Sequence, residues 1–353
     1  MFLRGLEADR IADVAERRVV EPESTELVSR MLGGDRLALA KLITRVENRH
    51  PDTPRILSAI HPHCGRAYTI GVTGPPGAGK STLVDRLAAW LRERNYRVGV
   101  VAVDPSSPFS GGAVLGDRIR MQKHFLDEGV FIRSLSTRGT HGGLARATRH
   151  VVRLLDAFGK DFVLTETVGV GQTELDVARL ADTTVVVLVP EAGDTVQAMK
   201  AGLLEIADIF VVNKADREGA QRLAQELRGM LELRPASGWQ VPVLLTSAEK
   251  GEGIDELAAR ILEHRDFLAR SSSREERAAR VRREEFRQML AEEIGRRIEA
   301  ALENGRFAEL LGQVDRGEVE PFEAVLRILD AEDAADLLRP EGRKTPEGGV
   351  SGP

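Results

Sequence analysis

The sequence predicts an α/β fold in which helices cover a mostly parallel β-sheet on both faces, with helical extensions at both ends. Short runs of Val, Ile and Leu recur along the middle of the chain without polar alternation, which is typical of strands buried on both faces. Helical periodicity separates these runs, and such alternation favours a parallel sheet. The predicted strands are Ile70–Thr73, Val98–Val103, Phe162–Thr165, Thr184–Val189, Ile209–Asn213 and Val243–Thr246.

Residues 1–66 precede the first predicted strand, and we expect them to form a helical N-terminal extension. From Ser24 to His61 the apolar residues recur with a broken helical period around the Gly33-Gly34 turn. Prolines, the last of them Pro62, close this section. The main domain is then expected to span residues 67–268.

A glycine-rich turn between the first strand and the helix after it matches a phosphate-binding pattern. In G-x-x-x-x-G-K-[ST], backbone N–H groups and the helix N-terminus bind phosphate, Lys supplies a point charge and Ser offers its hydroxyl to Mg²⁺. An ordinary Gly/Pro turn is the alternative, but the strand before it and the helix after it favour this P-loop. The pattern predicts a nucleoside triphosphate with Mg²⁺ as the ligand. The predicted loop residues are Gly74, Pro75, Pro76, Gly77, Ala78, Gly79, Lys80, Ser81 and Thr82.

An N-K-x-D pattern at Asn213, Lys214 and Asp216 follows a buried strand and predicts recognition of guanine. The Asp216 carboxylate can accept hydrogen bonds from the ring N1–H and the 2-amino group. Adenine has neither donor and would leave the acceptor unpaired, at a cost of about 1–3 kcal/mol. A strand-end turn rich in Asn and Asp is the alternative, which the P-loop upstream disfavours. Ser247 and Ala248 follow the next strand, where we expect backbone amides to contact the base.

Carboxylates at strand ends and in a glycine-rich stretch are candidates for a magnesium and catalytic shell. Mg²⁺ favours oxygen ligands, so the predicted ligands are Ser81, Asp104, Asp117 and Glu166. Without the P-loop, a turn Asp that caps a loop would be the preferred interpretation of Asp104. Gly169 follows Glu166 at the spacing of a γ-phosphate sensor. Most small GTPases have Asp where this chain has Glu166. The predicted catalytic residues are Lys80, Glu166 and Asp104.

The composition excludes several classes of protein. The chain of 353 residues has a net charge of -5 and no long basic block, which argues against nucleic acid as a partner. No apolar run approaches the roughly 18 residues of a membrane span, and the N-terminus is too acidic for a signal or transit peptide. Cys64 is the only cysteine, so no internal disulfide forms. We therefore expect a cytoplasmic protein with no membrane partner.

Residues 269–340 differ in character from the main domain. A charged stretch from Ser271 predicts a linker, and a long helix follows in which Phe286, Leu290 and Ile294 repeat every four residues. This apolar stripe could pack on the main domain or on a second subunit. Residues 341–353 lack apolar side chains sufficient for a core and are predicted to be disordered.

Five motifs occur in the order VTGPPGAGKSTLVDRL, VAVDPSSPFSGGAVLGDRIRM, LTETVGVGQTELDVA, PEAGDTVQAMKAG and NKAD. Together they resemble the MeaB/ArgK family, the GTPases associated with methylmalonyl-CoA mutase. The resemblance covers roughly residues 27–268. It implies a homodimeric P-loop GTPase that binds GTP, GDP and Mg²⁺. It also implies a chaperone role toward an adenosylcobalamin-dependent acyl-CoA mutase, with control of cofactor loading and reactivation of the mutase.

The resemblance also implies roles for two segments outside the nucleotide motifs. Residues 190–202 match the family's extra switch toward the mutase, in which Gln197 and Lys200 are the corresponding residues. The pattern alone favours an exposed helical lysine at Lys200. Residues 269–340 become a candidate dimerisation arm.

Two other functions remain as alternatives. The ArgK name has carried the description of a kinase that phosphorylates a periplasmic amino-acid transport protein, but the chain shows no distinct acceptor-binding domain. A nickel metallochaperone is disfavoured because related GTPases of that kind use paired Cys or His-rich stretches, whereas this chain has one cysteine and seven scattered histidines.

Overall fold

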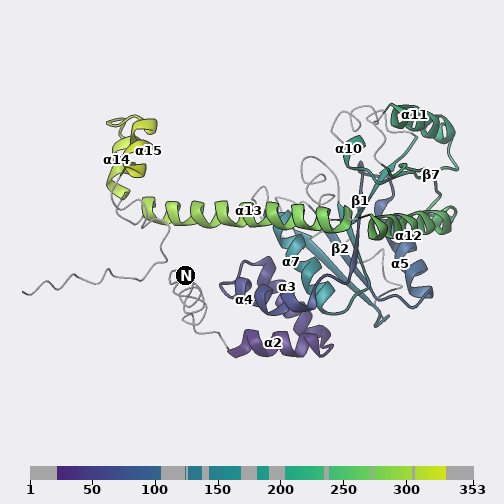
Figure 1. Cartoon of the computed structure of the whole chain (residues 1–353), viewed down its shortest axis with the longest axis horizontal. Coiled ribbons are helices and arrows are strands. Elements are labelled where there is room, and N and C mark those ends of the chain that lie inside the picture. The colour runs from purple at the N-terminus through teal and green to yellow at the C-terminus, as the bar shows by residue number, and fades with distance from the viewer. Residues whose placement is uncertain are drawn as a thin grey trace, which may run out of the picture. The chain divides into compact units, whose positions relative to one another are not determined.

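A sheet of seven parallel strands organises the first of two units of the chain (Figure 1). The computed structural model describes residues 22–104, 124, 126–136, 143–167, 181–190, 203–233, 238–271, 273–303 and 307–330. The first unit comprises residues 1–274 and the second comprises residues 275–353.

The strand order within the described residues is β3-β2-β4-β1-β5-β6-β7, and every neighbouring pair is parallel. This arrangement confirms the predicted fold class. β1 lies at the centre, between β4 and β5. The strands are β1 (Tyr68–Thr73), β2 (Val98–Asp104), β3 (Val130–Ser136), β4 (Phe162–Thr167), β5 (Thr183–Leu188), β6 (Ile209–Val212) and β7 (Val243–Leu245).

β3 is the one strand of this sheet that the sequence analysis does not predict. It lies at the sheet edge and pairs with β2 alone. Its sequence carries Arg133 and Ser134 where a doubly buried strand would be apolar. The Arg133 guanidinium binds the Glu47 carboxylate of the N-terminal helices. Because Arg133 has a polar partner outside the sheet, β3 lacks the continuous apolar run by which the other strands are predicted.

One face of the sheet packs on α5 (Lys80–Glu93) and α12 (Ile254–Arg270), which lie side by side in Figure 1. Alternate strand residues such as Ile70 and Val72 point to this face and share its core with apolar side chains of both helices. Side chains on a strand alternate between faces, so the other face receives a different set. That set forms two further clusters, one of them under α11 (Ala220–Glu232).

The N-terminal helices share a core with this second face. They are α2 (Pro22–Leu32), α3 (Arg36–Glu47) and α4 (Thr53–Ile60), and they pack with α7 (Gly143–Ala157). Fully buried side chains from all four helices meet β2 and β4 in one cluster. Each large apolar side chain among them contributes about 1.5–3 kcal/mol through the hydrophobic effect. The structure thus contains the predicted N-terminal helices, and their side chains complete the core on this face of the sheet.

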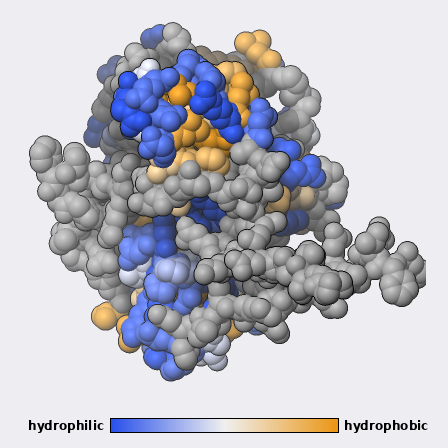
Figure 2. All heavy atoms as spheres, turned by 90° about the vertical axis from the view of Figure 1, so that its left-hand side faces the viewer, coloured by the Kyte–Doolittle hydropathy of each residue, from blue (hydrophilic) through white to orange (hydrophobic). Residues whose placement is uncertain are grey.

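The second unit contains α13 (Ser273–Glu303) except for its first two residues, together with α14 (Ala308–Asp315) and α15 (Pro321–Leu329). α13 begins inside the stretch that the sequence predicts as a linker. Large apolar side chains are exposed on α13 and α15, and Figure 2 shows hydrophobic side chains gathered among hydrophilic ones on one face. The exposed large apolar residues are Phe286, Met289 and Leu290 on α13 and Phe322, Val325, Leu326 and Leu329 on α15. Within the part of the chain that the structure describes, no helix is long and apolar enough to cross a membrane.

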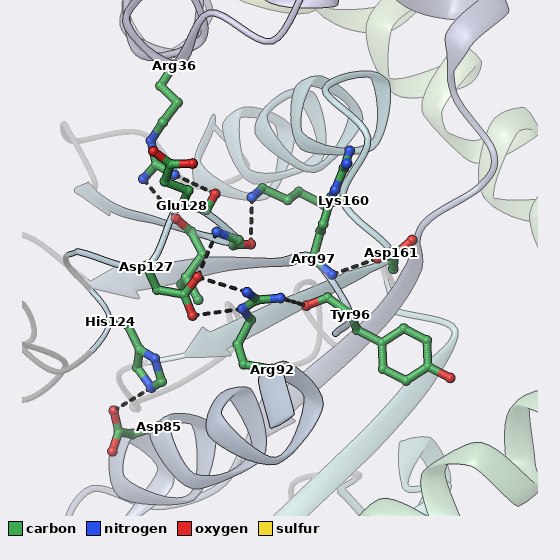
Figure 3. Close-up of polar contacts among 12 residues, drawn as sticks. Arg36, Asp85, Arg92, Tyr96, Arg97, His124, Asp127, Glu128, Lys160 and Asp161 are labelled. Atoms are coloured by element: carbon green, nitrogen blue, oxygen red, sulfur yellow. Dashed lines mark hydrogen bonds and ion pairs between the residues drawn. The ribbon is translucent and has the colours of Figure 1, made fainter. Parts of the chain in front are cut away.

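Polar contacts fasten the amino ends of β2, β3 and β4 to α5 and α3 (Figure 3). Arg92 of α5 binds both carboxylate oxygens of Asp127, at 2.8 and 2.9 Å. Lys160 donates to the Gly129 carbonyl at 2.8 Å, and Arg36 donates to two further carbonyls of the same turn. Lys160 is only 3% exposed. Burial, followed by the nearby cations Arg36 and Arg92, lowers the pKa of Lys160 to about 8.

The low pKa of Lys160 predicts that this site gains stability at alkaline pH. Between about 8 in the folded chain and the ordinary value of 10.5, the unfolded chain binds more protons, so the free energy of unfolding rises with pH. In the Lys160→Met variant, position 160 carries no titrating group. Relative to this variant, the free energy of unfolding of the unmodified protein should rise by about 3 kcal/mol between pH 7 and 10.5, measured by urea unfolding. Substitution of the exposed Lys41 by Met is the control. A stability difference between the unmodified protein and the Lys160→Met variant that stays constant over this range would contradict the prediction.

Candidate functional site

The carboxyl ends of the parallel strands meet at one edge of the sheet, where ligands of such folds bind. The central strand β1 leads directly into the P-loop at Gly74. On one side of β1, β4 carries Glu166, and β2 ends at Asp104. On the other side, β6 is followed by Asn213 and β7 by Thr246. The sheet order thus separates two halves of the site: a carboxylate half with Asp104 and Glu166, and an amide-rich half, named for Asn213, that comprises the loops after β6 and β7.

Glycines of the P-loop are required by their backbone angles and by close neighbours. Gly74 has a φ of 139°, and a Cβ placed there would lie 2.0 Å from the Val187 carbonyl oxygen. Gly79 has a φ of 87°, and a Cβ would lie 2.3 Å from Asn213 Nδ2. L side chains rarely adopt such angles. A cradle that a Cβ would fill is what the close approach of backbone to phosphate needs.

Lys80 lies within its own loop. Its Nζ donates to the carbonyl oxygens of Gly74, at 2.6 Å, and Pro75, at 3.0 Å. The residue is only 6% exposed, and it is the first residue of α5. The ammonium therefore lies at a helix N-terminus inside the loop, where it adds to the dipole that attracts phosphate.

Ser81 and Glu166 bring two oxygen ligands together at the carboxyl end of β4. Ser81 Oγ donates to Glu166 Oε1 at 2.5 Å, and both residues are buried. Glu166 follows Phe162 and Leu164 in the alternation that faces α5, which explains why its side chain meets Ser81. An alcohol and a carboxylate fit Mg²⁺, which would polarise a bound phosphate. Among the residues with described side chains, His, Cys, Asp and Glu form no metal-binding group of three or more.

Asn213 joins the P-loop to the loop after β7. Its Nδ2 donates to the Ala78 carbonyl at 2.8 Å. Its Oδ1 accepts from Thr246 Oγ1 at 3.1 Å and from the Ala248 amide at 3.0 Å. The side chain is almost fully buried. Three hydrogen bonds on one buried amide leave it a single orientation, which fixes the distance between the phosphate loop and the loop after β7.

Asp216 is the exposed carboxylate of the amide-rich half. Its Oδ1 accepts from Ser247 Oγ at 3.2 Å, and its Oδ2 lies 3.2 Å from Lys250 Nζ. The hydrogen bond from Lys250 lowers the pKa of Asp216 below its usual range. An aspartate is ionised at neutral pH already at its ordinary pKa. An ionised carboxylate is an acceptor only. It can therefore accept from the paired donors of guanine.

The amides assigned to the base have protein partners in this structure. The Ser247 amide donates to Glu252 and the Ala248 amide to Asn213. Their contact with a base stays a prediction. Lys214, the neighbour of Asn213, is half-buried and holds a φ of 57°, a left-handed angle that a non-glycine residue adopts at a cost of about 1 kcal/mol.

Several predicted site residues cannot be placed. Asp117, Gly169, Gln197 and Lys200 lie outside the described residues. Asp104 ends β2, but its side chain is likewise outside the description. Their catalytic, metal-binding and switch roles stay predictions. Pro76, Gly77 and Thr82 lie in the P-loop and at the start of α5 as predicted from the motif.

Arg86 and Lys250 are residues of the site that the sequence analysis misses. Arg86, on α5, donates to the carbonyl oxygens of Ala248 at 3.0 Å and Glu249 at 2.8 Å. One arginine on an amphipathic helix carries no motif, so no signal in the sequence singles it out. Lys250 lies in a turn of ordinary composition, and its contact with Asp216 depends on the turn's fold.

Comparison with known proteins agrees with this geometry. The family model described as Methylmalonyl Co-A mutase-associated GTPase MeaB matches residues 39–303. A Pyrococcus abyssi (strain GE5 / Orsay) relative, whose name describes a GTPase, is 49% identical over 308 residues, which cover 86% of this chain and 95% of the relative. GTPase ArgK of Escherichia coli (strain K12) is 40% identical over 261 residues, covering 71% of this chain and 78% of ArgK.

Two further proteins are similar. The mitochondrial methylmalonic aciduria type A homolog of Mus musculus is 38% identical over 261 residues, covering 69% of this chain and 62% of the mouse protein. A crystal structure described as LAO/AO transport system kinase has a TM-score of 0.65 and 30% identity, covering 88% of this chain and 98% of that one.

The close contact between Gly79 and Asn213 predicts that Gly79→Ala weakens nucleotide binding by about tenfold or more. The new methyl group would overlap the Asn213 side chain, and the backbone φ at Gly79 is unfavourable for alanine. Titration with a fluorescent GDP analogue measures the loss. The matched control is Gly229→Ala on α11, where nothing lies within 4 Å of the new Cβ. That control should bind normally and gain a little helix stability. Normal binding by Gly79→Ala would contradict the geometry.

Proposed function

The chain belongs to the MeaB family of methylmalonyl-CoA mutase-associated GTPases and is a GTPase, and on this premise we propose that it is a GTP-driven chaperone of an adenosylcobalamin-dependent acyl-CoA mutase. Methylmalonyl-CoA mutase is the first client to test. The chaperone gates loading of the cobalamin cofactor and protects or reactivates the mutase. GTP binding and hydrolysis drive these steps.

The match of the family model to residues 39–303 carries this proposal. The family's description associates its members with the mutase, and the name of the mouse relative refers to methylmalonic aciduria. The fold and the nucleotide-site geometry support the GTPase part. The client itself is inferred from the family's description.

The proposed chemistry is attack of water on the γ-phosphorus of GTP, with cleavage of the bond to the β–γ bridging oxygen to give GDP and inorganic phosphate. The P-loop amides and the Lys80 ammonium stabilise the charge on the β- and γ-phosphate oxygens. Ser81 and Glu166 are the oxygen pair that would hold Mg²⁺. The proposed metal ligands are these two residues together with Asp104 and Asp117, and the proposed catalytic residues are Lys80, Glu166 and Asp104.

We propose a cytoplasmic homodimer in which residues 269–340 form the dimerisation arm. Exposed apolar side chains on α13 and α15, among them Phe286 and Phe322, support this role. Residues 190–202, with Gln197 and Lys200, are the proposed switch toward the mutase. The net charge of -5 and the lack of a long basic block support a protein partner over nucleic acid.

A kinase for a periplasmic amino-acid transport protein is the second candidate function. It is favoured by one observation, the description of the similar crystal structure as an LAO/AO transport system kinase. The two functions differ in the fate of the γ-phosphate. Transfer of labelled γ-phosphate to a protein would support the kinase, whereas its release as inorganic phosphate supports the GTPase chaperone.

Asp216→Asn is expected to reduce the preference for guanine nucleotides about 10- to 100-fold. The substitution replaces one acceptor oxygen by an NH2 group, which cannot accept a hydrogen bond from the N1–H or the 2-amino group of guanine. The same variant should gain use of xanthosine triphosphate, whose 2-oxo group accepts from the new amide. Rates of GTP, ATP and XTP hydrolysis measure both effects, with Asp315→Asn in the second unit as the control. Equal use of ATP and GTP by the unmodified protein would overturn the guanine assignment.

Affinity capture from the native cell with a non-hydrolysable GTP analogue should recover a cobalamin-dependent acyl-CoA mutase with this protein. Peptide mass analysis identifies the client. A parallel capture with the Gly79→Ala protein, which is expected to bind the analogue poorly, controls for nucleotide-independent adhesion. Recovery of no mutase in the presence of bound nucleotide would count against the chaperone role while leaving the GTPase intact.

A further inference from the structure

A turn between β7 and α12 places a lysine beside the carboxylate proposed to recognise guanine. Lys250 Nζ lies 3.2 Å from Asp216 Oδ2. Ser247 Oγ, from the same turn, donates to the other oxygen, Oδ1, at 3.2 Å. Each oxygen of Asp216 thus has a partner from residues 247–250.

The backbone of this turn is held in place at both ends. Ser247 and Glu252 exchange two backbone hydrogen bonds, at 3.0 and 3.1 Å. Gly253 has a φ of 77°, and a Cβ there would lie 2.4 Å from the Leu245 carbonyl oxygen. These contacts hold the backbone of the turn, and with it the Cα of Lys250, in one position.

Arg86 fixes the same turn from the P-loop helix. Its guanidinium donates to the carbonyl oxygens of Ala248 and Glu249, the two residues before Lys250. Asn213 binds the Ala248 amide from the other side. The lysine is therefore carried by a segment whose position is tied both to the phosphate loop and to β6.

Asp216 needs such support because it is exposed. About a third of its side chain, 36%, is accessible to solvent, so packing alone does not select one orientation of the carboxylate. A carboxylate has about four lone-pair sites. It can hold Ser247 and Lys250 and still accept two hydrogen bonds from a base. Groups held in the bound orientation before binding lose less entropy when the ligand arrives.

We propose that Lys250 is a positioning residue for base recognition, whose ammonium holds the Asp216 carboxylate toward the N1–H and 2-amino donors of guanine. The inference rests on Asp216 recognising guanine, as proposed above. The hydrogen bond from Lys250 also lowers the pKa of Asp216. Because both groups are partly exposed, 53% for Lys250 and 36% for Asp216, the effect on affinity is modest, about fivefold at most.

The test compares Lys250→Met, which keeps the length and removes the charge, with Lys250→Arg, which keeps the charge. Dissociation constants are measured for GDP, for IDP, which lacks the 2-amino group, and for ADP. Lys250→Met should weaken GDP binding about two- to fivefold. IDP binding should fall less, because only one donor pairs with the carboxylate, and ADP binding should not change. Lys250→Arg should restore most of the GDP affinity.

Lys41→Met is the control for removal of a lysine charge, since Lys41 lies on the exposed surface of α3. Thermal unfolding checks that each variant is folded. High salt should shrink the difference between the unmodified protein and the Lys250→Met variant, because an exposed ion pair is screened. A merely structural turn residue would affect GDP and IDP equally and would be insensitive to salt.

Two results would overturn the inference, and they are distinguishable from failure of the guanine site. Unchanged GDP affinity and an unchanged GDP-to-IDP ratio in Lys250→Met would overturn it while the protein still prefers GDP over ADP. Equal loss in Lys250→Arg and Lys250→Met would also overturn it, because charge would then not matter. If the unmodified protein fails to prefer GDP over ADP, the guanine assignment of Asp216 falls, and the role of Lys250 falls with it.

Discussion

Asn213 is the constraint on which the nucleotide site depends. One buried amide side chain accepts from Thr246 and Ala248 and donates to Ala78, so the phosphate loop and the base loop cannot move independently. The contact leaves no room for a side chain at Gly79. The glycine and the asparagine, far apart in sequence, therefore satisfy one geometric condition.

Helix α5 transmits this geometry to the rest of the first unit. Lys80 and Ser81 open the helix at the phosphate site, Arg86 fixes the loop after β7, and Arg92 binds the turn before β3. Asp85, on the same helix, lies 3.3 Å from His124 and raises the pKa of that histidine (Figure 3). A single rigid helix thus sets the relative positions of the phosphate loop, the base loop and the sheet edge.

Much of this architecture is predictable from sequence because it depends on local patterns. Doubly buried strands give continuous apolar runs, and the P-loop requires glycines at fixed spacing. The meeting of Ser81 with Glu166 follows from the strand-end rule and the period of two along β4. β3 escapes prediction because Arg133 finds its partner in a distant helix. Arg86 and Lys250 escape because no periodicity in the sequence shows what a long charged side chain contacts.

Periodicity also shows that a helix has a buried face, but not what buries it. The N-terminal helices α2, α3 and α4 pack into the same cluster as β2, β4 and α7, with Leu39, Leu42 and Ile43 fully buried there. A protein trimmed to begin at residue 67 would therefore expose to water the apolar side chains of α7 and of the sheet that these helices cover. Such a fragment would keep every nucleotide motif and still be prone to self-association. A stable nucleotide-binding unit therefore includes α2, α3 and α4, although all three helices precede the first residue of the P-loop.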